Sequence, residues 1–302
     1  MTRLFESFDR ETTDRQYNPT LWTPRMGSED LLPAHIAFTQ QASERYREQS
    51  GTAVRVQDYG SDEYAGQMDV FRPEGLANNA PVVVYIHGGW WQWFCKEQFS
   101  FLAEPFNRQG YAVYMPGYRM AQDWDNATPM ESIVLQMQQA LVAILKEARR
   151  NQVQSVYLVG HSAGGHLVSV LHQTDFGVFG LSEEAQGLLK GVFSIAGLFD
   201  LRPLLDSFVN DAIKMSAESA CNVSPQLNLA AAPERVCPLH LLLPEWDTPE
   251  FFRQTKEYQD KLLRLGAPCH IWMASDRDHL DVIEKLIDPD DEVFDYLLKH
   301  MG

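Results

Sequence analysis

Short apolar runs alternate with longer helical patterns along most of this chain, from about residue 53 to the end. Most of the runs are rich in β-branched residues and are bounded by turn residues, which is typical of strands. Their near-continuous apolar character favours a parallel sheet that is buried on both faces. The predicted strands are VRVQDYG, QMDVFRP, PVVVYIHGG, YAVYMPGY, SVYLVGHS, KGVFSIAG, PLHLLLPE and CHIWMAS.

The segments between these runs carry apolar residues at helical spacing. One apolar stripe begins at Met130 and continues to Leu145. Another helix is predicted to begin at Thr248-Pro249 and to end at Gly266. Strands that alternate with helices predict βαβ crossovers and an α/β sheet, in which function gathers at the carboxyl ends of the strands.

We expect one domain over residues 1–302, a length that large α/β folds often reach as a single unit. Residues 1–50 are polar with helical stretches and are interpreted as an N-terminal lead-in. A segment at about 200–236 separates two strands by far more than the usual connection. It contains enough apolar residues to cover a site, so we predict a small helical cap there.

Composition narrows the class of protein further. The formal net charge of −16 repels phosphate backbones and anionic membranes, so neither nucleic acid nor a membrane is expected as a partner. The N-terminus lacks the apolar core of a signal peptide and no apolar run is long enough to span a membrane, which predicts a cytoplasmic protein. The cysteines have no C-x-x-C spacing and predict neither disulfides nor a zinc site; they are Cys95, Cys221, Cys237 and Cys269.

One predicted strand, SVYLVG, leads directly into Gly160-His161-Ser162-Ala163-Gly164-Gly165 and then into an apolar helix. This G-x-S-x-G motif between a strand and a helix is typical of a nucleophile elbow. Glycines are needed because the turn is sharp and bulky neighbours would clash. The turn lifts the Ser162 hydroxyl above the sheet and aims the amide of Ala163 at a developing negative charge. Ser162 is therefore the predicted nucleophile.

A second glycine turn follows the strand PVVVYI, in the sequence His87-Gly88-Gly89-Trp90-Trp91. An H-G-G turn at this position presents backbone N–H groups to an oxyanion. We predict that Gly88, Gly89 and Ala163 donate to that oxyanion. Trp90 and Trp91 are predicted to bind an aromatic substrate, with core packing as the alternative role.

A serine nucleophile needs a base and a partner for that base, in the chain order serine, acid, histidine. Among nine histidines, His279 lies in a loop after the last predicted strand. Asp247 lies between a strand end and a helix start, and the neighbouring Thr248 can cap that helix instead. Asp200 is the alternative acid. Asp276 and Asp278 are too close in sequence to reach the far side of the imidazole.

Further motifs extend the pattern over nearly the whole chain: Gln16–Pro19, Tyr59–Gly60, Met68–Pro73, His87–Gln92, Gly160–Gly165, Asn210–Asp211, Ser224–Pro225 and Asp247–Gln254. Together they resemble the kynurenine formamidase (arylformamidase) branch of the hormone-sensitive-lipase-type α/β hydrolases. The segment DTPEFFRQ is the most specific of them. The resemblance implies the α/β-hydrolase fold, with a mostly parallel eight-stranded sheet, helices on both faces and a small helical cap. It also implies the triad Ser162, Asp247 and His279.

The resemblance implies hydrolysis of a small acyl group, formyl or acetyl, from an aryl amide such as N-formylkynurenine or an N-acylanthranilate. Two departures reshape the pocket: Leu280 follows His279 where the family often has Phe, and residues 90–94 are unusually aromatic. No cofactor and no metal are expected, since no H-E-x-x-H or H-x-G-x-H pattern is present. The alternatives are a carboxylesterase for small aryl or short-chain esters, a non-catalytic binding protein, and a metal-dependent formamidase. The sequence leaves a homodimer open.

Overall fold

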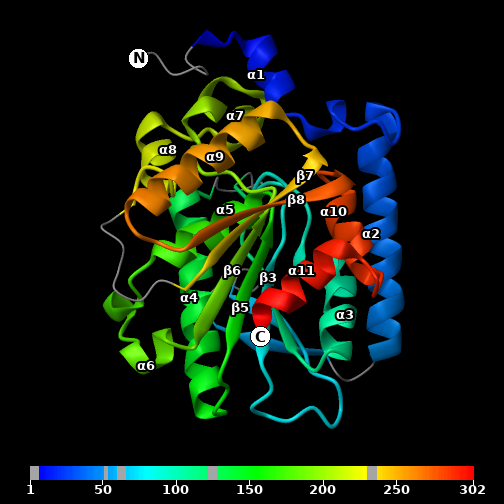
Figure 1. Cartoon of the computed structure of the whole chain (residues 1–302), viewed down its shortest axis with the longest axis vertical. Helices are drawn as coiled ribbons and strands as arrows, with labels where there is room; N and C mark the ends of the chain where they lie inside the picture. Colours follow the sequence, from blue (N-terminus) through cyan, green and yellow to red (C-terminus); the bar gives the residue numbers. More distant parts are fainter. Residues whose placement is uncertain (1–6, 51–53, 60–65, 122–127, 230–236) are drawn as a thin grey trace.

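An eight-stranded sheet forms the centre of the computed structural model, which describes residues 7–50, 54–59, 66–121, 128–229 and 237–302 (Figure 1). The strand order is β1-β2-β4-β3-β5-β6-β7-β8. β2 runs antiparallel to both of its neighbours, and the remaining pairs are parallel. The strands are β1 Val54–Asp58, β2 Gln67–Phe71, β3 Val82–Ile86, β4 Ala112–Pro116, β5 Val156–His161, β6 Leu189–Ile195, β7 Leu239–Trp246 and β8 Cys269–Asp278.

Each predicted apolar run forms one of these strands, and the predicted mostly parallel α/β sheet is confirmed. Strands β3 and β4 are buried along their whole length, as expected of a sheet that is covered on both faces. The last strand differs from the prediction. β8 continues to Asp278, where the sequence suggested a loop from Ser275, because Asp278 is still paired with Trp246 of β7. His279 therefore follows the strand directly.

Helices cover both faces of the sheet (Figure 1). One hydrophobic cluster packs α4 Met130–Arg150, α5 Ala163–Gln173, α8 Ala217–Val223 and α9 Pro249–Arg264 against the sheet. The other cluster packs α2 Ser28–Ser50, η4 Lys96–Leu102, α3 Ala103–Arg108 and α11 Glu292–Met301. The remaining elements are α1 Arg10–Gln16, η2 Pro19–Leu21, η5 Phe176–Phe179, α6 Glu183–Gln186, η6 Arg202–Asp206, α7 Phe208–Ile213, α10 Asp281–Glu284 and η7 Lys285–Ile287.

The predicted cap segment forms the short helices η6, α7 and α8, joined by loops and turns; its last part, residues 230–236, lies outside the described residues. The N-terminal α1 packs against η6. Asp14 accepts a hydrogen bond from the N–H of Phe208 at 2.6 Å, and Arg10 pairs with Asp211 at 2.6 Å. The N-terminal segment and the cap segment therefore lie together at one end of the molecule (Figure 1). That the chain forms one domain stays a prediction.

Among the helices that the structure describes, none is long and apolar enough to cross a membrane.

Candidate active site

Ser162 lies at the sharp turn between β5 and α5, with backbone angles φ 54° and ψ −116°. Non-glycine residues rarely adopt this conformation, and it is held here by the packing around it. The N–H of Ser162 donates to the carbonyl of Ile195 on β6 at 2.8 Å. A side chain at Gly160 would collide with the backbone of Gly164, which explains why the motif needs both small residues. The geometry is that of a nucleophile elbow.

The turn after β3 is pressed against this elbow. A Cβ atom on Gly88 would lie 2.8 Å from the carbonyl oxygen of His161 and 3.0 Å from the Cβ of Ser162. A Cβ on Gly164 would overlap the carbonyl oxygen of Ile86 at the end of β3. Only glycine allows two backbone segments to approach so closely. The two turns predicted separately from sequence are therefore in direct contact.

Tyr118 holds the turn after β3 from behind. Its hydroxyl lies 3.1 Å from the carbonyl oxygen of His87 and 3.3 Å from that of Gly88, and its ring stacks on His87 at 4.4 Å. Gly89 and Trp90 have positive φ angles of 106° and 53°, so the turn is tightly wound. Fixing the two carbonyls fixes the direction in which the neighbouring N–H groups point.

His279 and Asp247 are joined side by side at the ends of β8 and β7. Nδ1 of His279 lies 2.8 Å from Oδ2 of Asp247, and Oδ1 of Asp247 accepts from the N–H of Thr248 at 2.7 Å. The Thr248 side chain caps α9 by accepting from the N–H of Phe251, so the aspartate is available to the histidine. The Phe251 ring packs edge-on against the His279 ring at 5.1 Å. The carboxylate and the imidazole are thus each held by a neighbour, Thr248 and Phe251.

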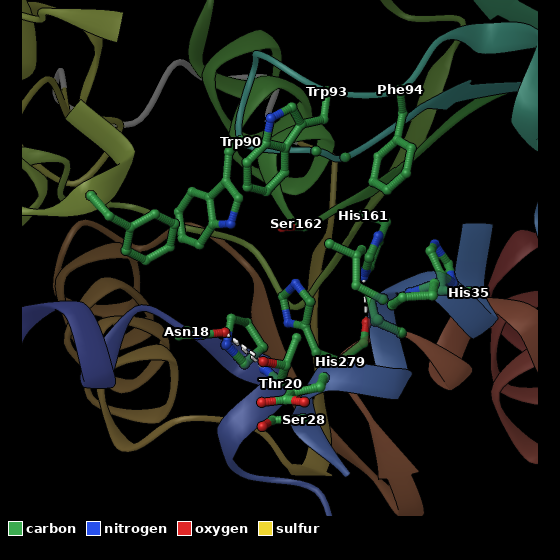
Figure 2. Close-up of a pocket in the computed structure, with 18 of the residues that line it drawn as sticks. Asn18, Thr20, Ser28, His35, Trp90, Trp93, Phe94, His161, Ser162 and His279 are labelled. Atoms are coloured by element: carbon green, nitrogen blue, oxygen red, sulfur yellow. Dashed lines mark hydrogen bonds between the residues drawn. The ribbon is translucent and has the colours of Figure 1, made fainter. Parts of the chain in front are cut away.

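The loop that carries His279 is held from two sides. Nε2 of His161, the residue before the elbow serine, lies 2.7 Å from the carbonyl oxygen of His279 and donates to it (Figure 2). Burial lowers the pKa of His161 well below its usual range, so this ring stays neutral. On the other side, Arg25 binds Asp278 at 2.7 Å and Glu284 at 3.2 Å. These contacts anchor the histidine backbone.

The alternative acid of the sequence analysis has another partner. Asp200 is buried and binds the guanidinium of Arg202 at 2.8 Å. Asp276 accepts no bond from the imidazole among the described contacts, and its N–H donates to Glu245. The carboxylate that contacts His279 is that of Asp247.

A cavity of about 420 Å³ opens above these residues (Figure 2). Ser162 and His279 both line it, together with Gly88 and Gly89. Its aromatic wall consists of Trp90, Trp93, Phe94, Phe99 and Phe208. The remaining lining residues are Asn18, Pro19, Thr20, Ser28, Glu29, Leu32, Pro33, His35, His161 and Leu280.

The two predicted substrate-binding tryptophans occupy different environments in the structure. Trp90 lines the cavity, but Trp91 is fully buried beneath it, and its ring packs edge-on against His166 at 5.0 Å. The prediction for Trp91 therefore needs correction, because consecutive residues in this wound turn point in different directions. Trp93, another member of the aromatic run 90–94, also takes a place in the lining.

Sequence reasoning missed the N-terminal wall of the cavity, which was interpreted as a lead-in. Residues 18–35 supply Asn18, Thr20 and Ser28 to the lining, opposite Trp90 (Figure 2). The sequence contained a signal for this role, because two of its motifs, QYNP and DTPEFFRQ, contact each other in the structure. Tyr17, from the QYNP motif, is fully buried and donates to Glu250 of the DTPEFFRQ motif at 2.8 Å.

Gln254, from the same helix, completes that link. Its Nε2 donates to the Tyr17 hydroxyl at 2.8 Å, and its Oε1 accepts from the N–H groups of Phe199 and Asp200. The N-terminal segment, the loop after β6 and the start of α9 are thereby tied together. Because Asp247 lies just before α9, the same link connects the cavity wall to the acid.

Acidification is expected to destabilise the fold as the pH falls from about 6.5 to about 4. Burial lowers the pKa of both His87 and His166 to about 4, from an ordinary value of 6.5. In this window the unfolded chain binds protons that the folded chain rejects, so stability is lost as pH falls, by roughly 2 kcal/mol per histidine at pH 5. Asp281 opposes this, because burial and Asp278 raise its pKa to about 6.

Thermal unfolding at pH 7.5, 6.0 and 5.0 measures the balance. The contributions of His87 and His166, to which the buried His161 adds in the same direction, outweigh that of Asp281, so the Tm should fall with each step of acidification. A Tm that stays constant or rises towards pH 5 would show that these rings are protonated in the folded chain.

Comparison with known proteins covers nearly all of the chain. The family BD-FAE matches residues 68–233. The kynurenine formamidase of Danio rerio is 32% identical over 303 residues, which are 99% of this chain and 98% of that protein. The kynurenine formamidase of Salmo salar is 30% identical over 304 residues, with 99% and 98% covered.

Solved structures show the same architecture. A Silicibacter protein described as a candidate thioesterase has a TM-score of 0.77 and 27% identity, with 97% of this chain and 99% of that chain covered. An esterase of Pyrobaculum calidifontis has a TM-score of 0.68, with 92% and 94% covered. At 17% identity the second likeness concerns the fold alone.

Proposed function

This chain belongs to the kynurenine formamidase family and carries a BD-FAE domain, and on that premise we propose that it hydrolyses the formyl amide of an arylamine, with N-formylkynurenine as the reference substrate. The observation that carries the proposal is the cavity. It brings Ser162 and His279 together with an H-G-G turn and an aromatic wall. An aryl ring can pack against Trp90 and Phe208 while its amide carbonyl faces the serine.

In the proposed reaction the hydroxyl of Ser162 attacks the formyl carbon as His279 removes its proton. The pairing of Nδ1 with Asp247 at 2.8 Å holds the proton on that nitrogen, so Nε2 is the basic atom. The imidazolium formed in this step is stabilised by the carboxylate. His279 then protonates the aryl nitrogen, and the arylamine leaves. Nε2 of His279 then activates a water molecule, and this water releases formate from the acyl-enzyme.

The negative oxygen of each tetrahedral intermediate is assigned to the N–H groups of Gly88, Gly89 and Ala163. Ala163 is the first residue of α5, where an N–H has no acceptor within the helix and the helix dipole favours negative charge. The turn after β3 is held in place before substrate arrives, by Tyr118. Preorganised donors of this kind contribute on the order of 10²–10³ in rate each.

A carboxylesterase acting on small aryl or short-chain esters is the second candidate, because the same groups cleave esters and solved relatives of this fold include esterases. The size of the cavity limits the length of the acyl chain, whether the substrate is an amide or an ester. We propose that Phe208 of the cap segment and the N-terminal wall close it above Ser162, since both contribute to the lining.

A substrate panel tests this proposal. We expect kcat/KM to be highest for N-formylkynurenine and formanilides, lower for p-nitrophenyl acetate, and lowest for esters with an acyl chain of about ten carbons, because an enclosed cavity excludes extended chains. N-acetylanthranilate tests the size of the acyl group. The measurements should include EDTA, which a metal-dependent formamidase would not tolerate. Efficient cleavage of the long-chain ester would indicate an open groove and favour the esterase function.

We also infer a cytoplasmic location, supported by the free state of all four cysteines. The formal charge of −16 supports the absence of nucleic-acid and membrane partners. The homodimer that the sequence left open stays a prediction.

A further inference from the structure

The cavity has two chemically different ends (Figure 2). Trp90, Trp93 and Phe94 lie at one end, and Asn18, Thr20 and Ser28 lie at the other, with Ser162 and His279 between them. Glu29, which follows Ser28 in the first turn of α2, also lines the cavity. A substrate whose aryl ring occupies the aromatic end can therefore direct a ring substituent towards this carboxylate.

The polar end carries donors, the amide of Asn18 and the hydroxyl of Ser28, as well as acceptors. Oδ1 of Asn18 accepts from the N–H of Thr20 at 3.2 Å and from its hydroxyl at 2.8 Å. The Thr20 hydroxyl thus uses its proton in the hydrogen bond to Asn18, and only its lone pairs remain for a further partner. The carboxylate of Glu29 is acceptor-only when ionised. Of these groups, the ionised carboxylate is the one that favours a cationic donor on the substrate.

No positively charged side chain within the described lining balances the negative charge of Glu29. Among the described residues that line the cavity, none is Lys or Arg. Its histidines are engaged elsewhere: His35 contacts Glu284 at 2.7 Å, His161 donates to the backbone of His279, and His279 contacts Asp247. Within the described part of the lining, Glu29 therefore supplies the formal charge that a substrate meets outside the catalytic pair.

The N-terminus of α2 opposes this preference for a cation, because helix N-termini attract anions. The helix end is equivalent to about half of a positive charge, whereas an ionised Glu29 carries a full negative charge. The sum favours a cation at this end of the cavity. A role for Glu29 in stabilising its own helix is shared by the neighbouring Asp30, which is in the same turn but does not line the cavity.

We propose that Glu29 is a specificity determinant that makes this enzyme select aryl amides with an ammonium group over aryl amides with a carboxylate. The proposal rests on the proposed function and names the substrate class within it. N-acylanthranilates, which carry a carboxylate beside the amide, then become poor substrates.

Three formanilides test the selection, each with a different group at the same ring position: aminomethyl, hydroxymethyl or carboxylate. With the wild-type enzyme, kcat/KM should decrease in that order. Glu29 is exposed, and ion pairs with an exposed carboxylate contribute up to about fivefold, so we expect roughly that ratio between the aminomethyl and hydroxymethyl compounds. Raising the salt concentration should reduce the ratio.

Two matched variants locate the effect. Glu29→Gln should bring the aminomethyl and hydroxymethyl compounds to within about twofold of each other, through a higher KM for the aminomethyl compound. Asp30→Asn also removes one carboxylate from the first turn of α2 and should leave the wild-type ratio unchanged. If both variants changed the ratio equally, the selection would come from the general field of the protein and the role of Glu29 would be wrong.

The remaining outcomes separate this proposal from the proposed function. Hydrolysis of all three formanilides without a charge preference, or with a preference for the carboxylate, would overturn the selection by Glu29 and leave the formamidase activity standing. A failure to hydrolyse any formanilide, with esters cleaved normally, would overturn the proposed function and the selection with it.

Discussion

Ser162→Ala is expected to lower kcat on formanilides by a factor on the order of 10⁶, as the loss of a serine nucleophile does in serine proteases. The hydroxyl is the atom that forms the acyl-enzyme, and no second nucleophile takes its place in the proposed reaction. The substitution is small and retains the backbone of the elbow, where the N–H of Ser162 binds Ile195. The Tm should therefore stay close to that of the wild type.

Ser28 provides the matched control, because it is the other serine in the lining of the cavity. Ser28→Ala should retain most of the activity. A serine-directed organophosphate, followed by peptide mass analysis, should modify Ser162 alone, and the label should disappear in Ser162→Ala. Labelling of another serine, or near-normal turnover in the variant, would show that the nucleophile lies elsewhere.

Asp247→Asn is expected to lower kcat by roughly 10³–10⁴. In the wild type, Oδ1 of Asp247 accepts from Thr248 and Oδ2 faces Nδ1 of His279. An asparagine keeps its oxygen towards the Thr248 N–H and turns its amide group towards the imidazole. That amide donates, so Nδ1 loses its proton and Nε2 carries it instead. The imidazole then presents a donor to Ser162 and cannot remove its proton.

Asp200→Asn is the control for this experiment, since Asp200 is the other aspartate at a neighbouring strand end and pairs with Arg202. It should cost far less in kcat than Asp247→Asn. Steady-state kinetics on formanilide, with circular dichroism to verify folding, measure both. A larger loss from Asp200→Asn would place the acid after β6 and contradict the assignment.

The amino-acid sequence by itself determined the strands and the two glycine turns. Strands such as β3 are continuous apolar runs between turn residues, so local pattern identifies them without knowledge of their neighbours. The turns at Gly88 and Gly164 are equally local, because only glycine tolerates the close approach of two backbones. Chain order was enough to propose Asp247 and His279 as a pair, although they come from different strands.

The tertiary structure alone decided what encloses the site. Residues 18–35 resemble an ordinary polar lead-in, and their place in the cavity depends on the contact of Tyr17 with Glu250, far away in the sequence. The difference between Trp90 and Trp91 arises from positive φ angles that turn neighbouring side chains apart, which no hydrophobic pattern records. Each catalytic residue belongs to a local motif that is visible in the sequence, whereas the walls of a pocket depend on long-range packing, and this is why the chemistry could be predicted before its enclosure.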